Sequence, residues 1–516
     1  MSCWHVIRRS AGSDMASDTA WQTIARQLAG SREKFLNSGG CLKQRQQDYL
    51  QALLRRHASS DFGLEHGFAG LRGIDDYRKA VPLQTAEDYQ RRISGLTAAS
   101  PHVVAMDTGF VETTGGSSDG TKVIAYGPSG LTDFRNALYP WLDDLVRNRP
   151  AISQGPAYWS ISPVLRPRAQ DYQGLPMGLG NDARYFGEQL ATPLLQTLAV
   201  PPDVAILETL DQWRFQTLLH LLSTPALRLV SVWSPSFILN LLHALPSLVE
   251  DLCRELLPVH ARRLEQALDG AELDTRILWP QLDTLSCWTH GRAAAFLPEL
   301  QRRFPHVHIQ PKGLLATEGV VSLPLEGLPD PVLAACSSFF EFLDNTGVPR
   351  LAWELQTGGV YEVVLSNSLG LYRYRLGDQV EVTGWKDDLP LLRFLGRGDR
   401  QVDLCGEKLD DAFVSRALEK LPGFSLLCPS MEPQPHYLCI SEKPVTTDVE
   451  AALCGNPQYA YARRLAQLAP VQYQVRDDAG AQYLHWRLQQ GQCLGDIKPT
   501  ALLPDDGFVR FLEGSS

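Results

Sequence analysis

Apolar residues near the start of the chain recur at the three- and four-residue spacing of helices. Leu42, Leu53 and Leu54 fall on one helical face, and the turn-rich stretch 59–63 ends that helix. Pro82 stops a second, shorter helix, because proline lacks a backbone donor. Helices are therefore predicted at residues 42–54, 74–81 and 85–93.

The middle of the chain alternates short apolar runs with amphipathic stretches. Such alternation is typical of a layered α/β domain with mixed or parallel sheets. Strands are predicted at residues 103–106, 123–126, 158–161, 204–207, 227–233, 284–288 and 307–310. Helices are predicted at residues 212–222, 236–245, 248–257 and 293–303.

From Ser337 onward, strand patterns dominate until a polar, glycine-flanked turn at 396–399. Strands are predicted at residues 339–342, 360–365, 371–376, 379–382, 391–395 and 401–404. A proline-rich connection at 428–435 follows a helix at 410–421. The remainder predicts a small α+β unit with strands at 437–440, 471–475 and 483–488 and a helix at 458–468. We expect a large N-terminal domain (1–396), a hinge (397–399) and a small C-terminal domain (400–516).

Composition narrows the class of protein. Of the 516 residues, 44% are hydrophobic and 21% charged, and the net charge of −10 argues against a nucleic-acid binder. The ten cysteines form no CxxC pair, so neither a disulfide framework nor a zinc site is indicated. No stretch of about 18 consecutive apolar residues predicts a membrane span. We expect a soluble cytoplasmic protein with no membrane partner and with residues 1–20 poorly ordered.

A glycine-rich loop at 112–122 is the first candidate for chemistry. Glycines can adopt positive φ and point successive N–H groups at phosphate oxygens. The loop adds one fixed positive charge, at Lys122, but the spacing is not that of a Walker A motif, and Asp119 would repel an anion. A flexible surface loop is the alternative. The hydroxyl donors would come from Thr113, Thr114, Ser117 and Ser118.

Two carboxylates follow predicted strands. Asp378 ends a strand at a Gly-Asp turn, where a carboxylate can accept both hydrogens of a ribose diol. Glu318 closes a short apolar run after Thr317, and a carboxylate there can hold Mg²⁺ together with nucleotide phosphates. By itself the first could be an ordinary turn, and the second a helix cap or a surface charge.

These segments occur together and in a fixed order. The order resembles the adenylate-forming enzyme superfamily, and within it the auxin-responsive Gretchen Hagen family of acyl acid amido synthetases. The family's loop has the form Ser-Ser-Gly-Thr-Ser-x-Gly-x-x-Lys, and Thr113–Lys122 has the same length. The resemblance spans about residues 35–505, and its segments are Thr113–Lys122, Trp288–Gly291, Ala316–Gly319, Leu376–Asp378, Gly396–Asp399 and Gly495–Pro499.

The resemblance implies definite roles. ATP phosphates would lie against the loop, Gly291 would border the adenine, and Asp378 would hold the ribose. Glu318 would bind Mg²⁺, and Lys498 would reach the reacting carboxylate and the α-phosphate. The implied nucleotide-binding residues are Thr113, Thr114, Gly115, Ser117, Ser118, Lys122, Gly291, Thr317, Asp378 and Arg397, with Asp399 at the hinge beside Arg397.

The implied fold is that of an adenylate-forming ligase, in which a mobile small domain covers the large one. The implied reaction converts a carboxylic acid and ATP to acyl-AMP and then passes the acyl group to an amine, an amino acid being expected. A thioester-forming ligase is the alternative enzyme. The loop departs from the family at Gly116 and Asp119, which leaves a non-catalytic nucleotide- or acyl-binding homologue as a third possibility.

Overall fold

A four-stranded parallel sheet lies in the middle of the protein. The computed structural model describes residues 13–37, 41–113, 122–159, 171–179, 182–207, 209–270, 272–398, 401–405, 407–492 and 497–514. The strand order is β3-β6-β7-β8. Parallel strands need crossover connections, usually helical, which explains the alternating sequence pattern. The strands are β3 (Ala157–Trp159), β6 (Leu229–Ser231), β7 (Thr284–Cys287) and β8 (His308–Pro311).

Helices and a 3-10 turn complete this part. Residues 202–206, within which a strand was predicted to begin, form the 3-10 helix η4 (Pro202–Ile206), because the two prolines before Asp203 favour a turn over a strand. The predicted helices 236–245 and 248–257 are one continuous helix with Pro246 inside it. The helices are α9 (Leu210–Leu222), α10 (Pro235–Glu255), α11 (Pro258–Leu268), α12 (Thr275–Leu278), η5 (Gly291–Phe296) and α13 (Leu297–Arg303).

Helix α10 is, among the described residues, the one helix long and apolar enough to cross a membrane by length and composition. Such helices are also found in the cores of soluble proteins. Phe237, Leu241 and Leu245 on α10 are buried in a hydrophobic core with Trp213 of α9 and Leu285 of β7. The buried apolar face therefore has a packing role within this structure.

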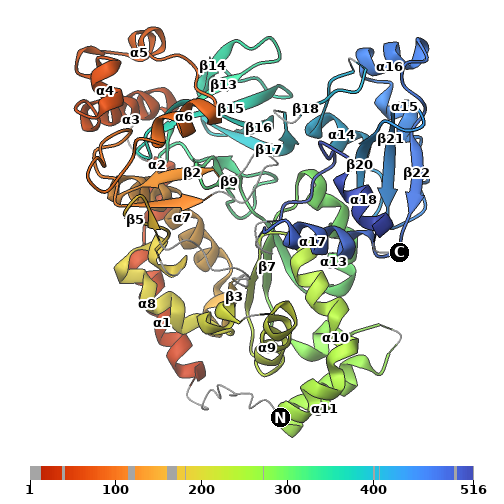
Figure 1. Cartoon of the computed structure of the whole chain (residues 1–516). Coiled ribbons are helices and arrows are strands. Elements are labelled where there is room, and N and C mark those ends of the chain that lie inside the picture. Colours follow the sequence, from red (N-terminus) through yellow and green to blue (C-terminus); the bar gives the residue numbers. More distant parts are fainter. Residues whose placement is uncertain are drawn as a thin grey trace.

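A seven-stranded antiparallel sheet with the order β11-β12-β17-β16-β15-β13-β14 stands above the parallel one (Figure 1). The predicted strands 371–376 and 379–382 are one long strand, interrupted by a register shift around Gly377. The strands are β11 (Ser322–Leu323), β12 (Val332–Leu333), β13 (Phe339–Leu343), β14 (Pro349–Leu351), β15 (Val360–Asn367), β16 (Leu371–Lys386) and β17 (Leu389–Arg397).

The N-terminal helices pack against this sheet and share its core. Residues 13–20, expected to be poorly ordered, begin helix α1, whose Trp21 and Ile24 are buried. Thr85 caps α6 through a capping box with Asp88. Residues 103–106 form turns and not the predicted strand. The helices are α1 (Ser13–Leu28), α2 (Ser31–Asn37), α3 (Leu42–Arg56), α4 (Asp61–Glu65), η1 (Phe68–Gly70), α5 (Ile74–Ala80), α6 (Ala86–Ile93), α7 (Pro128–Asn148) and α8 (Glu188–Thr197).

The C-terminal unit, residues 401–514, has its own cores and the sheet β20-β21-β22. The predicted strand 483–488 is helical, in α17. Tyr483 and Trp486, three residues apart on this helix, both pack on Phe508. Residues 428–430, expected in a connection, belong to β20. The elements are β18 (Gln401–Val402), β19 (Leu409–Asp410), α14 (Asp411–Ala417), β20 (Ser425–Ser430), β21 (His436–Ser441), α15 (Val449–Leu453), α16 (Pro457–Arg464), β22 (Gln472–Val475), α17 (Ala479–Gln489) and α18 (Gly507–Gly514).

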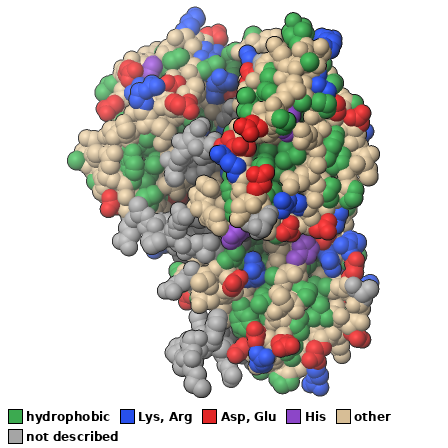
Figure 2. All heavy atoms as spheres, turned by 45° about the vertical axis from the view of Figure 1, so that its right-hand side comes forward, with side chains coloured by type: hydrophobic (Ala, Val, Ile, Leu, Met, Phe, Trp, Pro, Cys, Tyr) green, Lys and Arg blue, Asp and Glu red, His purple; other side chains and the backbone are tan. Residues whose placement is uncertain are grey.

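The C-terminal unit packs on the rest of the chain through α14, which contacts β17 of the antiparallel sheet and the helix η5 (Figure 1). On the face drawn in Figure 2, acidic and basic side chains are intermixed. A polyanion would need a continuous basic surface, and this face does not offer one.

Candidate functional site

The glycine-rich loop connects two paired strands, β1 (Phe110–Thr113) and β2 (Val123–Tyr126). Thr113 pairs with Val123, so the two ends of the loop, Thr113 and Lys122, are held close together. Both side chains are partly buried. Thr114, Gly115, Gly116, Ser117, Ser118 and Asp119 lie outside the described residues.

Glu318 and Thr317 form the turn of a second small hairpin, between β9 (Leu315–Ala316) and β10 (Gly319–Val320). The Tyr126 hydroxyl donates to the Thr317 carbonyl oxygen at 2.6 Å, which joins this turn to the strand that leaves the glycine-rich loop. Asn367 of β15 donates to the Glu318 carbonyl oxygen at 2.7 Å. The structure therefore brings Glu318 next to the hairpin that carries the loop.

Glu318 is 9% exposed, and its carboxylate accepts one long hydrogen bond, 3.5 Å, from the Tyr374 hydroxyl. Burial raises the pKa of Tyr126, and the nearby carboxylates of Glu112 and Glu318 raise it further. Two carboxylates thus lie near one tyrosine. Within the described part of the chain, no three His, Cys, Asp or Glu side chains gather as a metal cage. A single carboxylate with spare acceptor capacity still fits Mg²⁺, since that ion commonly keeps water and substrate phosphates as its other ligands.

Asp378 lies on β16 where the strand bulges. The pairing with β15 shifts from Val364–Arg375 to Glu362–Gln379, so Gly377 and Asp378 fall in the bulge. Bulges re-aim side chains and are common beside active sites. On the other side Asp378 pairs with Arg397 of β17, whose guanidinium lies 3.9 Å from the carboxylate.

Gly291 begins η5 in the left-handed region, with φ +57°. A Cβ atom there would lie 3.4 Å from the Phe394 ring of β17, three residues before Arg397. Gly291 is therefore packed beside the strand pair that carries Asp378 and Arg397. The preceding Thr289 has a buried hydroxyl with no hydrogen-bond partner among the described residues, as a group that awaits a polar ligand would.

His290 lies between these two residues, and its Nε2 atom is 3.2 Å from a carboxylate oxygen of Asp330. Burial alone would raise the pKa of Asp330, but hydrogen bonds from His290, Thr383 and Arg393 outweigh burial and lower the pKa to about 2. The ionised carboxylate thus fixes the segment that ends at Gly291.

Lys498 reaches the same segment from the C-terminal unit. Its ammonium lies 5.7 Å from the centre of the Trp288 ring, three residues before Gly291. The lysine is exposed, but the chain after it is anchored: Asp411 at the start of α14 accepts hydrogen bonds from the Thr500 hydroxyl and from the backbone N–H groups of Ala501 and Leu502. The buried Asp411 carboxylate thus fixes the segment that carries the exposed lysine side chain.

The described candidate residues are linked pairwise across several elements. Glu318 meets the loop hairpin through Tyr126, and Tyr374 joins it to β16, the strand that carries Asp378. Gly291 lies beside Phe394 of β17 and Lys498 lies over the Trp288 ring, and Asp399 lies outside the described residues. Tyr126, Tyr374, Asn367 and Asp411 were not predicted, because their contacts join segments far apart in the sequence.

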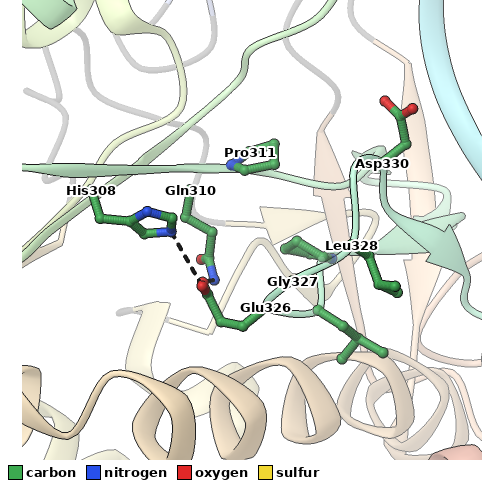
Figure 3. Close-up of a pocket in the computed structure, with 9 residues that line it drawn as sticks. His308, Gln310, Pro311, Glu326, Gly327, Leu328 and Asp330 are labelled. Carbon is green, nitrogen blue, oxygen red and sulfur yellow. Dashed lines mark hydrogen bonds and ion pairs between the residues drawn. The ribbon is translucent and has the colours of Figure 1, made fainter.

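A cavity under β8 holds none of the predicted site residues (Figure 3). His308 and Gln310 point toward Glu326, with contacts of 3.2 and 2.7 Å. His306 contacts the Trp279 carbonyl oxygen. The side chains of His308 and Gln310 are thus both paired with Glu326 in this cavity.

Comparison with known proteins gives the family. The family model described as "GH3 family N-terminal domain" matches residues 31–309, which is more than half of the chain. The chain belongs to the GH3 family. The "GH3 family central domain" matches residues 331–397, which covers β12 to β17. The GH3 match therefore includes the parallel sheet and most of the antiparallel one.

Several curated relatives of this GH3 protein are plant proteins. A "Probable indole-3-acetic acid-amido synthetase GH3.9" from Oryza sativa subsp. japonica is 30% identical over 163 residues, 30% of this chain and 36% of the relative. A "Probable indole-3-acetic acid-amido synthetase GH3.4" from the same organism is 24% identical over 433 residues, 73% of this chain and 68% of the relative. In the first of these alignments the chain spans about a third of the relative's length.

Solved structures confirm the fold. The structure titled "GH3.15 acyl acid amido synthetase" matches with a TM-score of 0.76 at 20% identity, over 92% of this chain and 94% of the other. A second, of AtGH3.15 in complex with 2,4-DB, has a TM-score of 0.78 at 18% identity, over 99% and 97% of the two chains. The predicted α/β architecture with a small C-terminal unit is therefore confirmed.

Proposed function

We propose that this GH3 protein is an ATP-dependent acyl acid amido synthetase. It adenylates a carboxylic acid and transfers the acyl group to an amine, with an amino acid as the acceptor. The observation that carries this proposal is the position of Lys498, which reaches from the C-terminal unit to the Trp288–Gly291 segment. The family and the names of the relatives agree with it. We further propose a cytoplasmic location.

In the first step, a carboxylate oxygen attacks the α-phosphorus of ATP and pyrophosphate leaves. Lys498 offsets the negative charge that develops on the transferred group, because a positive charge positioned there favours the transition state over the ground state. Asp378 accepts the ribose hydroxyls, and Thr113 and Lys122 flank the phosphates at the base of the loop. Thr289 and Gly291 border the adenine.

Glu318 would hold Mg²⁺, which would supply charge neutralisation at the phosphates. The Tyr374 hydroxyl and the Asn367 amide orient Glu318 from its side chain and from its backbone. Positioning and charge neutralisation suffice for this displacement, so no residue becomes covalently bonded.

In the second step, the amine nitrogen attacks the acyl carbon of acyl-AMP, the carbon–oxygen bond to AMP breaks, and the amine loses a proton. We propose that the small domain, residues 400–516, rotates about the hinge 397–399 between the steps. Rotation would move Lys498 away from Trp288 and open the site to the amine, as lid motions do in other enzymes.

Replacing Lys498 with alanine tests the first step. We expect acid-dependent pyrophosphate release to fall about 100-fold or more, the effect of removing one group that stabilises transition-state charge. Binding of ATP, followed by calorimetry, should change little, because Thr113, Asp378 and Gly291 remain.

Lys443→Ala is the matched control, since Lys443 is also an exposed lysine of the C-terminal unit. Full pyrophosphate release by the Lys498→Ala protein would remove this lysine from the mechanism. AMP release that depends on a thiol and on no amine would instead select the thioester-forming ligase.

A further inference from the structure

The carboxyl edge of the parallel sheet carries a group of polar and aromatic side chains, of which only Trp288 belongs to the proposed nucleotide site. Ligands of α/β proteins bind at this edge, because the strand ends and their loops converge there. Trp159 ends β3, Trp233 follows β6, Trp288 follows β7, and Lys312 follows β8. Each of the four strands thus contributes one of these side chains, at or just after its carboxyl end.

Lys312 is at the centre of this group. Its ammonium donates to the Ser231 hydroxyl at 2.8 Å and lies 5.2 Å from the ring centre of Trp141 and 5.1 Å from that of Trp233. An ammonium has three hydrogens to donate, and only one has a side-chain acceptor here. Among the described residues, Lys312 forms no ion pair with a carboxylate.

The surroundings of Lys312 favour an anion. Burial lowers the pKa of Lys312 to about 8, which is the response of a cation that lacks a counter-charge. The neighbouring thiol of Cys287 cannot supply a negative counter-charge, since burial raises its pKa to about 12. The indole rings compensate in part by cation–π attraction. A negatively charged ligand would compensate more fully.

Two further polar groups on the same row of the sheet lack partners. Trp159, Ser231 and Ser286 are paired in register across β3, β6 and β7. The Trp159 indole N–H and the Ser286 hydroxyl are buried, and neither has a hydrogen-bond partner within the described ranges. Unpaired buried polar atoms are uncommon and call for an explanation such as a missing ligand. Together with the Lys312 ammonium, the Trp159 N–H and the Ser286 hydroxyl make three donor groups, and no carboxylate of the described residues pairs with them.

The row also connects to the proposed reacting centre. The ring centres of Trp233 and Trp288 lie 5.8 Å apart, and the Lys498 ammonium lies 5.7 Å from the ring centre of Trp288. Two indoles thus separate the Lys312 ammonium from the Lys498 ammonium. A substrate with its reacting carboxylate near Lys498 could place a second anionic group at Lys312.

We propose that Lys312 binds a substrate carboxylate that does not react, with the Trp159 N–H and the Ser286 hydroxyl as additional donors. The proposal rests on the proposed function and specifies its substrate class. Two sources carry this chemistry: the second carboxylate of a dicarboxylic acid substrate, and the α-carboxylate of the acceptor amino acid.

Lys312→Met removes the charge and keeps the chain length. In the first arm, pyrophosphate release without amine compares monocarboxylic acids with dicarboxylic acids of equal length. A dicarboxylic substrate predicts that the variant loses about 10- to 100-fold in kcat/KM on dicarboxylic acids alone, as expected for a charged hydrogen bond. In the second arm, amide formation compares an amino acid with its decarboxylated amine. Binding of the acceptor predicts a similar loss on the amino acid alone.

Lys386→Met, an exposed lysine at the end of β16, is the control, and circular dichroism checks the folding of each variant. Lys312→Gln is the second variant if Lys312→Met does not fold. An equal loss on every acid and amine, or no loss on any, would overturn the proposal. If the wild type releases no pyrophosphate with any acid, the proposed function fails, and calorimetry then tests Lys312 separately. Binding of dicarboxylic acids or amino acids by the wild type alone would support Lys312, and equal binding by the variant would refute it.

Discussion

At the scale of single residues, His57 shows how a buried side chain makes stability depend on pH. The Tyr372 hydroxyl donates to the Val104 carbonyl oxygen at 2.8 Å, so the imidazole Nδ1 must donate to Tyr372, 2.7 Å away. The other ring nitrogen, Nε2, is buried without a partner in the described structure. A proton there would be poorly solvated, and burial therefore lowers the pKa of His57 to about 4.

The sign follows from linkage. The unfolded chain binds a proton on His57 near pH 6.5, whereas the folded chain binds it only near pH 4, so the free energy of unfolding falls as the pH drops between these values. We expect the protonation of His57 to lower the free energy of unfolding by about 2 kcal/mol between pH 7 and pH 5. Urea denaturation of wild type and His57→Gln at both pH values measures this difference. An identical pH dependence in the two proteins would show that His57 does not titrate as inferred.

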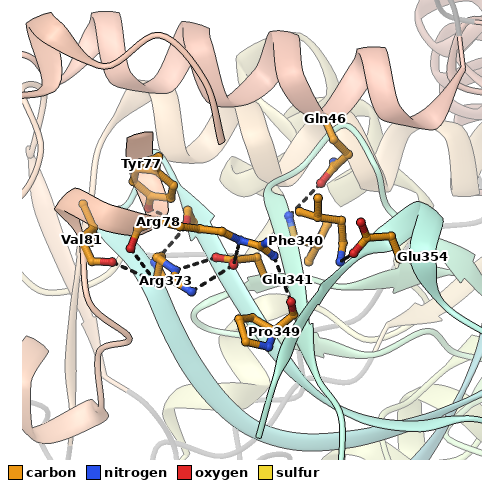
Figure 4. Close-up of polar contacts among 11 residues, drawn as sticks. Gln46, Tyr77, Arg78, Val81, Phe340, Glu341, Pro349, Glu354 and Arg373 are labelled. Atoms are coloured by element: carbon orange, nitrogen blue, oxygen red, sulfur yellow. Dashed lines mark hydrogen bonds and ion pairs between the residues drawn. The ribbon is translucent and has the colours of Figure 1, made fainter. Parts of the chain in front are cut away.

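At the scale of elements, a buried ion cluster fixes α5 to the antiparallel sheet (Figure 4). Glu341 of β13 accepts from Arg373 of β16 at 2.8 Å and from Arg78 of α5 at 2.7 Å. Arg373 also donates to the carbonyl oxygens of Arg78 and Val81, at the end of the helix. The carboxylate is 1% exposed, so its removal would leave two arginines without their counter-charge.

We expect Glu341→Gln to lower the free energy of unfolding by about 3–5 kcal/mol, the usual cost of breaking a buried ion pair. The control is Glu362→Gln in the same sheet, whose partner Arg375 is 43% exposed. Loss of that pair should cost about 1 kcal/mol or less. Denaturation monitored by tryptophan fluorescence compares the two. Equal costs would contradict the inference that burial determines the strength of the Glu341 cluster.

At the scale of the whole molecule, Arg292 joins the GH3 domain to the C-terminal unit. Its guanidinium, next to Gly291, donates to the carbonyl oxygens of Leu418 and Ser425 and to the Ser425 hydroxyl, at 2.6–3.2 Å. Burial lowers the pKa of Arg292 to about 10, which leaves it charged at neutral pH. A rotation of the small domain would have to break all three hydrogen bonds.

Arg292→Met should therefore loosen the C-terminal unit without unfolding it. We expect hydrogen exchange to become at least several-fold faster in residues 418–425 and 291–296, because the carbonyl oxygens of Leu418 and Ser425 lose their donor and η5 loses these bonds to the C-terminal unit. Arg276→Met, at an exposed arginine of α12, is the control. Unchanged exchange in both segments would mean that other contacts hold the interface.

Sequence patterns predicted most elements and failed where a local signal was ambiguous. Residues 483–488 alternate in a way that suits a strand, but Tyr483 and Trp486 also share a helical face, and the contact with Phe508 decided for the helix. Residues 204–207 have strand-like composition, but the preceding prolines impose a turn. For the site, the residue types and their order indicated Glu318, Asp378, Gly291 and Lys498.

The sequence by itself determined the layered α/β class and the resemblance to the GH3 family, and it predicted which residues are candidates for the chemistry. These depend on local spacing and on residue type. Only the tertiary structure decided that Lys498 meets Trp288, that Asp411 anchors the segment after Lys498, and that Lys312 lies among indole rings without a described counter-ion. Such contacts join residues far apart in the chain, and their geometry depends on how separate elements pack.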